Sequence, residues 1–179
     1  EEAPQTKRII FHPKILPTIV ICDPDLTVGM PPKVTAGTGM DAFSHCLEAY
    51  CAPGFHPLAD GIAVEGMRLI ASALPRVMSA PADLEARADM LAAAAMGATA
   101  FQKGLGGMHA LAHPIGALFD THHGMTNATL MPYVLAHNRA AIEVRIQRLA
   151  AYLGLPDPGF DSFQQLVLDL RRQVGVPHT

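Results

Sequence analysis

Residues 34–50 decide the fold class, and they read VTAGTGMDAFSHCLEAY. Apolar residues recur here at helical spacing, and the stretch ends at Pro53-Gly54, so we expect one helix. Within it, Asp41 and His45 are four residues apart, which places both side chains on one face of a helix. An Asp–His pair at this spacing is more often an ordinary surface pair. Taken alone, the stretch predicts a helix and only a weak site.

The chain after residue 50 keeps the helical periodicity and contains no strand-like run. Six further segments have apolar residues at helical spacing between short turns. They are Pro57–Met78, Asp83–Gln102, Gly107–Phe119 (interrupted at Pro114), Thr126–Asn138, Ala140–Leu153 and Phe160–Val174. Seven helical segments joined by short turns predict an all-α helical bundle.

The segment before residue 31 has a different pattern. Ile9–Phe11 and Ile19–Cys22 are short β-branched runs between prolines, which is typical of strands. Two short strands cannot form a stable sheet by themselves. We interpret them as the end of a sheet whose other strands lie outside this chain, and we expect truncation at both ends.

Composition limits the classes of partner. The formal net charge is −3, a mild acidic balance that gives no electrostatic footprint for nucleic acid or an anionic membrane. The most apolar run, residues 90–100, is too short to span a bilayer. Cys22, Cys46 and Cys51 are odd in number and form no CxxC pair, which argues against a secreted disulfide framework. We expect small-molecule partners and a reducing, cytoplasmic location.

Histidines cluster in one part of the chain: His109, His113, His122 and His123. Imidazoles buried among Gly, Ala, Leu and Met need a hydrogen-bond acceptor or a metal. An Asp with histidines from separate helices is a common way to build a site in a bundle, and this O/N ligand set suits Fe²⁺, Zn²⁺ or Mn²⁺. Spacing leaves the ligand set open. His113 lies four residues after His109, as His45 follows Asp41, but Pro114 disturbs helical geometry at His113.

Four motifs resemble those of the iron-containing (group III, metal-dependent) alcohol dehydrogenases. Residues 39–50, GMDAFSHCLEAY, resemble the family's GxDAxxHxxEAY segment. Residues 104–117, GLGGMHALAHPIGA, resemble its GLGxxHAxAHPxGA signature. Residues 123–132, HGMTNATLMP, resemble HGxxNAxxLP with a methionine where leucine is usual, and DPDLT at residues 23–27 resembles DPxLT. The resemblance runs in order from about residue 17 to residue 138.

The resemblance implies a site in which one carboxylate and three imidazoles hold Fe²⁺ or Zn²⁺. The implied ligands are Asp41, His45, His109 and His123. It makes His113 a non-ligand near the nicotinamide and a candidate proton-relay group. Phe101 resembles an aromatic position near substrate and nicotinamide, and Leu26 lies in a segment near the cofactor.

The resemblance also implies a two-domain parent protein. Residues 1–30 would be the remnant of an N-terminal α/β domain that binds NAD(P). Residues 31–179 would be the helical metal-binding domain, truncated at its C-terminus. The family's Gly-Gly-Gly-Ser phosphate-binding motif is absent, so we expect the isolated chain to bind metal but to be inactive. The parent would pass hydride between an alcohol and NAD(P), with the alkoxide bound to the metal, and would form a homodimer or larger assembly.

Two other functions compete with this interpretation. An all-helical metallohydrolase often has an adjacent His-Asp pair among its ligands, and no such dipeptide occurs in this sequence. A non-catalytic helical domain, whose histidines serve only packing, predicts no bound metal and tolerance of His→Ala substitutions.

Overall fold

The computed structural model describes residue 10 and residues 12–178, and all regular secondary structure in this part of the chain is helical. The α-helices are α1 (Pro32–Cys51), α2 (Pro57–Ser79), α3 (Leu84–Ala100), α4 (Gly107–Phe119), α5 (His123–Tyr152) and α6 (Phe160–Gln173). Short 3-10 turns form η1 (Pro13–Ile15), η2 (Pro24–Thr27) and η3 (Phe101–Lys103). The predicted all-α helical bundle is confirmed. No helix of the described residues is long and apolar enough to cross a membrane.

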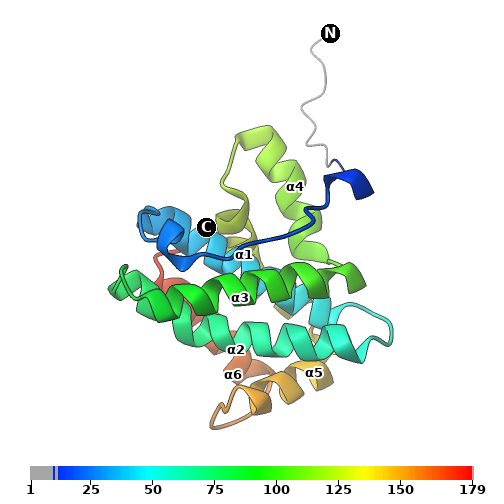
Figure 1. Ribbon diagram of the computed structural model, residues 1–179. Coiled ribbons are helices and arrows are strands. Elements are labelled where there is room, and N and C mark those ends of the chain that lie inside the picture. Colours follow the sequence, from blue (N-terminus) through cyan, green and yellow to red (C-terminus); the bar gives the residue numbers. More distant parts are fainter. Residues whose placement is uncertain (1–9, 11, 179) are drawn as a thin grey trace.

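Helix α1 is the centre of the bundle, because α2, α3 and α5 all pack against it. Figure 1 shows α2 and α3 side by side, with α4 rising away from the other helices. The ring of Phe43 on α1 stacks on Phe163 of α6, with 6.4 Å between centroids, and both side chains are fully buried. Burying a large apolar side chain of this kind contributes roughly 1.5–3 kcal/mol. Since α1 is buried on most sides, polar residues on it need partners inside the protein.

Gly97 lets α3 approach α1 beside His45. A Cβ atom at Gly97 would lie 3.2 Å from the carbonyl oxygen of Ala42 and 3.2 Å from the Cβ of His45. These distances are shorter than ordinary van der Waals contacts, so a larger residue would separate the two helices. Gly97 therefore helps to place α3 against the face of α1 that carries His45.

Two of the predicted helices form one continuous helix. Thr126–Asn138 and Ala140–Leu153 both lie in α5, which begins three residues earlier, at His123. Residues 133–152 contain neither Gly nor Pro, so nothing in the sequence interrupts the backbone hydrogen bonds. The predicted interruption at Pro114 is also wrong, because α4 continues through this proline. The ring removes one backbone donor without ending the helix.

The strand predicted at Ile19–Cys22 does not form. Residues 16–23 run along the outside of the bundle as irregular chain, and Ile19, Val20 and Ile21 are 69–85% exposed. A strand needs a partner strand, and none lies within residues 12–178. The other strand prediction, Ile9–Phe11, falls largely outside the described residues. The assignment of residues 1–30 to a nucleotide-binding domain stays a prediction.

Candidate metal centre

Helix α1 supplies two of the predicted ligands. Asp41 and His45 lie one turn apart, and His45 Nε2 is 3.8 Å from Asp41 Oδ2. Each side chain is 21% exposed, so the pair sits at the border between core and solvent. Burial lowers the pKa of His45 and outweighs the opposing effect of the Asp41 charge. The imidazole is therefore neutral at pH 7 and keeps the lone pair that a metal needs.

Helix α4 supplies His109 in its first turn. This histidine is buried, and its ring stacks on His45 with 4.8 Å between centroids and 17° between planes. His109 Nε2 is 3.9 Å from Asp41 Oδ1. The α4 histidine thus contacts both residues of the α1 pair.

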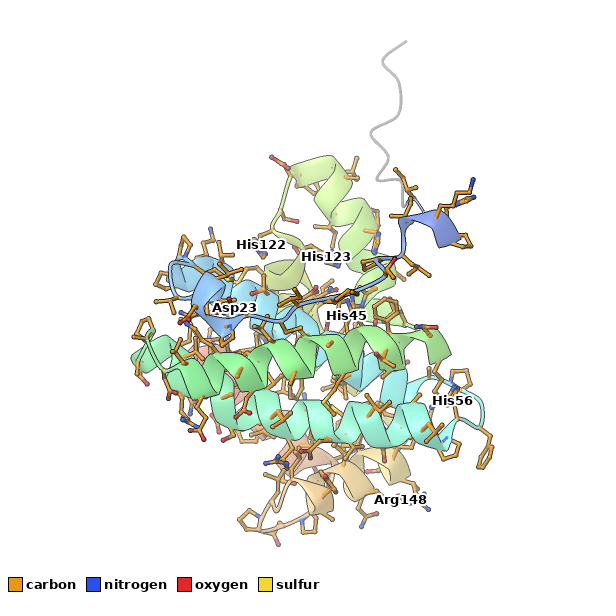
Figure 2. The ribbon with its side chains drawn as sticks, viewed as in Figure 1. Asp23, His45, His56, His122, His123 and Arg148 are labelled. Carbon is orange, nitrogen blue, oxygen red and sulfur yellow. The ribbon has the colours of Figure 1, made fainter. Side chains whose placement is uncertain are left out.

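Helix α5 supplies His123 as its first residue. His123 Nε2 is 3.7 Å from Asp41 Oδ1. This approach depends on Gly124, because a Cβ atom there would collide with the carbonyl oxygen of Gly37 on α1. The glycine of the His-Gly pair therefore lets the start of α5 touch the α1 backbone, which brings the neighbouring imidazole to Asp41. Figure 2 shows His123 with its neighbour His122 and with His45 of α1.

Three of the four predicted ligands converge. One ligand atom from each of Asp41, His109 and His123 lies within 4.8 Å of the other two. His45 is not part of this group, although its ring contacts His109 and its Nε2 faces Asp41. We call Asp41, His109 and His123 the ligand cluster, with His45 at its edge.

The amide of Asn127 shows that the lone pairs of the ligand cluster meet at one point. Asn127 Nδ2 lies 2.8 Å from Asp41 Oδ1, 3.1 Å from His109 Nε2 and 3.2 Å from His123 Nε2. An NH₂ group has two hydrogens, yet three acceptors face this one. Converging oxygen and nitrogen lone pairs from a carboxylate and imidazoles are what a divalent cation requires. The residues present fit the predicted metal.

A buried carboxylate, Glu48, lies behind His109. Its Oε2 is 2.7 Å from His109 Nδ1, and its Oε1 accepts a hydrogen bond of 2.6 Å from the backbone N–H of Met108. Burial would raise the pKa of Glu48, but hydrogen bonds from His109 and from the amides of Gly106 and Met108 outweigh burial and lower that pKa. Glu48 is therefore ionised at neutral pH.

Sequence reasoning assigned no role to Glu48 or Asn127, although helical spacing pointed to both. Glu48 lies three residues after His45, on the face that carries Asp41. Asn127 lies four residues after His123, which is one helical turn. Both residues complete a set of polar side chains on the inner faces of α1 and α5.

The other predicted site residues lie at different distances from the ligand cluster. The His113 ring is 5.1 Å from that of His123 and 6.2 Å from that of His109, outside the ligand cluster. Phe101, in η3, has its ring 5.1 Å from the His45 ring. Leu26, in η2, is 81% exposed, and no described contact joins it to the cluster. The proposed roles of these three residues stay predictions.

The model for the C-terminal domain of the Fe-containing alcohol dehydrogenase family matches residues 35–179. The chain belongs to this family. It is 42% identical over 181 residues to 4-hydroxybutyrate dehydrogenase from Cupriavidus necator, covering 96% of this chain and 47% of that protein. It is 39% identical over 155 residues to NAD-dependent methanol dehydrogenase from Bacillus methanolicus, covering 86% of this chain and 41% of that protein.

Solved structures of iron-containing alcohol dehydrogenases have the same fold. The iron-containing alcohol dehydrogenase from Thermococcus thioreducens superposes with a TM-score of 0.86 and 32% identity, covering 94% of this chain and 44% of that one. The predicted family and its helical C-terminal fold are confirmed. The chain spans less than half the length of the curated relatives named above.

Proposed function

We propose that this chain is the metal-holding half of an NAD(P)-dependent alcohol dehydrogenase, with Asp41, His45, His109 and His123 as ligands to one divalent metal. The observation that carries the proposal is the convergence of three ligand lone pairs on Asn127 Nδ2. The family supports iron, and the ligand set of one carboxylate and three imidazoles also suits Zn²⁺.

The metal, when bound, would act as a Lewis acid that lowers the pKa of the substrate hydroxyl. Hydride transfer to nicotinamide is chemistry of the cofactor, which the chain must orient. His113, half-buried against His123, is our candidate for carrying the hydroxyl proton toward solvent. Phe101, packed on His45, would present an apolar surface to the alcohol chain or the nicotinamide.

The names of the relatives support a primary alcohol as substrate. The relatives above are named for 4-hydroxybutyrate and methanol, each of which has a primary hydroxyl group. We propose the same class of hydroxyl for this protein, with the corresponding aldehyde as product. We also propose a cytoplasmic homo-oligomer, which the free cysteines and the exposed apolar residues Ile19 and Ile21 support.

Metal analysis of the chain, purified anaerobically without chelator, tests the site. We expect near-stoichiometric iron or zinc in the wild type and its loss in His123→Ala. The matched control is His122→Ala, because His122 is the exposed neighbour of His123 and lies outside the ligand cluster. Metal retained in His123→Ala would contradict the ligand assignment, and no metal in the wild type would contradict a site built by this chain.

The proposed turnover is to be measured in a protein of the relatives' full length, since this chain spans less than half of that length. In it, we expect His113→Ala to keep the metal while lowering kcat for a primary alcohol with NAD⁺ or NADP⁺. Loss of metal in that variant would make His113 a ligand instead. An unchanged kcat would remove it from the proton path.

A further inference from the structure

The contacts of Glu48 differ at its two carboxylate oxygens. Oε1 accepts from the backbone N–H of Met108 at 2.6 Å, and Oε2 faces Nδ1 of His109 at 2.7 Å. The side chains of Glu48 and His109 are each only 4% exposed, so water does not compete for these contacts. A carboxylate is acceptor-only, and therefore Nδ1 of His109 must carry the hydrogen.

The opposite nitrogen of His109 independently indicates the same tautomer. His109 Nε2 lies 3.1 Å from Asn127 Nδ2, and this amide nitrogen is a donor because it also contacts the carboxylate of Asp41 at 2.8 Å. Nε2 must then be an acceptor with its lone pair directed into the ligand cluster. The two ends of the ring agree that hydrogen is on Nδ1 and the lone pair is on Nε2.

We propose that Glu48 is a positioning residue that holds His109 as the Nδ1–H tautomer and so presents Nε2 to the metal. The part that concerns metal affinity rests on the proposed function, whereas the tautomer does not. Carboxylate partners of metal-binding histidines fix ring orientation and ligand basicity, and their loss typically weakens metal binding by about 10–100-fold.

Glu48 also fixes α4 relative to α1. The N–H of Met108 is in the first turn of α4, where backbone donors have no partner within the helix. A Cβ atom at Gly106 would lie 3.0 Å from Glu48 Oε1, so the glycine leaves room for the carboxylate. The side chain of Glu48 on α1 thus binds the backbone at the start of α4 and orients His109, the residue after Met108.

Glu48→Gln separates a positioning role from a packing role. The amide has nearly the same shape but offers one acceptor and one donor. Three donors face it, namely the backbone N–H groups of Gly106 and Met108 and the Nδ1–H of His109. If the glutamine oxygen keeps the Met108 hydrogen bond, its NH₂ group faces His109 Nδ1, and the ring must move its hydrogen to Nε2. That hydrogen would point into the ligand cluster.

The test uses the whole 179-residue chain, with ¹⁵N-labelled histidine for NMR and Zn²⁺ titration for affinity. In metal-free wild type we expect His109 to be protonated at Nδ1, and in Glu48→Gln at Nε2. We expect Zn²⁺ affinity to fall about 10–100-fold in the variant. The control is Asp60→Asn, because the Asp60 carboxylate accepts from Lys103 and Arg145 rather than from a histidine. It should change neither the tautomer nor the affinity.

The outcomes distinguish this inference from the proposed function. An Nε2–H tautomer in the wild type would overturn the role of Glu48 without any variant, so the test survives a Glu48→Gln protein that fails to fold. Metal binding in the wild type with an unchanged tautomer and affinity in Glu48→Gln would overturn the inference and leave the proposed function intact. A wild type that shows the Nδ1–H tautomer but binds no Zn²⁺ would overturn the proposed function and the affinity part of the inference.

Discussion

At the scale of residues, Asn127 makes contacts that a metal would replace. Its fully buried amide donates to Asp41 and faces the lone pairs of His109 and His123, while its own Oδ1 has no hydrogen-bond partner among the described residues. The NH₂ group therefore stabilises the cluster in the absence of a cation and competes with one for the same lone pairs.

The substitution Asn127→Ala should lower the stability of the metal-free chain and tighten Zn²⁺ binding. Leaving buried acceptors without a donor costs about 1–3 kcal/mol. The rise in Tm on adding Zn²⁺ should therefore be larger in the variant than in the wild type. Asn138→Ala, on the same helix and outside the cluster, is the control. Weaker Zn²⁺ binding in Asn127→Ala would show that the amide supports the metal instead.

Thiol reactivity should follow burial. Burial raises the pKa of Cys46 to about 12 and that of Cys51 to about 12, whereas Cys22 is exposed. We expect iodoacetamide at pH 8 to label Cys22 rapidly in the folded chain and all three cysteines in guanidinium. The thiol of Cys46 on α1 packs against Gly66 of α2 and Gly97 of α3, so its rapid labelling in the folded chain would contradict this packing.

The same thiols predict a loss of stability in alkali. A pKa that is raised in the folded state favours folding below the unfolded value of about 9, and this contribution is lost as the pH rises from about 9 to about 12. The free energy of unfolding should fall over that range. Cys46→Ala with Cys51→Ala should reduce the slope, as urea denaturation at several pH values would show.

At the scale of elements, the crossing of α1 and α5 sets the position of His123. Gly124→Ala would push the start of α5 off the carbonyl oxygen of Gly37. Overpacking of this kind costs about 1–3 kcal/mol, and we expect metal binding to weaken with it. The control is Gly61→Ala, because a Cβ atom at this site on α2 meets nothing within 4 Å. Urea denaturation and metal analysis of both variants test this prediction. Unchanged stability and metal content in Gly124→Ala would contradict it.

The elements also show what the sequence could and could not predict. The bounds of α4 were predicted correctly. The predicted segment and the observed helix both begin at Gly107 and end at Phe119. The division of α5 near Asn138 was wrong, since a polar residue within a helical pattern does not end a helix. The strand at Ile19–Cys22 depends on a partner strand, which local sequence cannot supply.

At the scale of the whole molecule, sequence motifs predicted the ligands. The residues that contact those ligands, Glu48 and Asn127, could be identified only from the three-dimensional fold. Glu48 and His109 lie 61 positions apart, and Asp41 and Asn127 lie 86 apart. No local pattern pairs residues at such separations. Asp41 and His123 could be predicted as ligands through the family resemblance, whereas the contacts of Asn127 with both side chains depend on the packing of α1 against α5.

Metal binding should order α4 more than any other described helix. Helix α4 packs mainly against α5, and Figure 1 shows it projecting from the bundle. A metal held by Asp41, His109 and His123 would add a second connection to α1, beside the Glu48 contacts at the first turn of α4. We expect amide exchange in α4 to slow on adding Zn²⁺ and to recover with chelator, while α2 stays unchanged. Equal slowing in both helices would indicate a general gain in stability instead.

The ligand cluster joins chain segments that a ribosome makes at different times. Asp41 and His45 emerge with α1, but His109 and His123 emerge only after α2 and α3 have been completed. A nascent chain would therefore have only two of the four proposed ligands during much of its synthesis. At the proposed site, tight capture of a metal would wait until α4 and α5 have docked on α1, so metal loading would report that these three helices are in place.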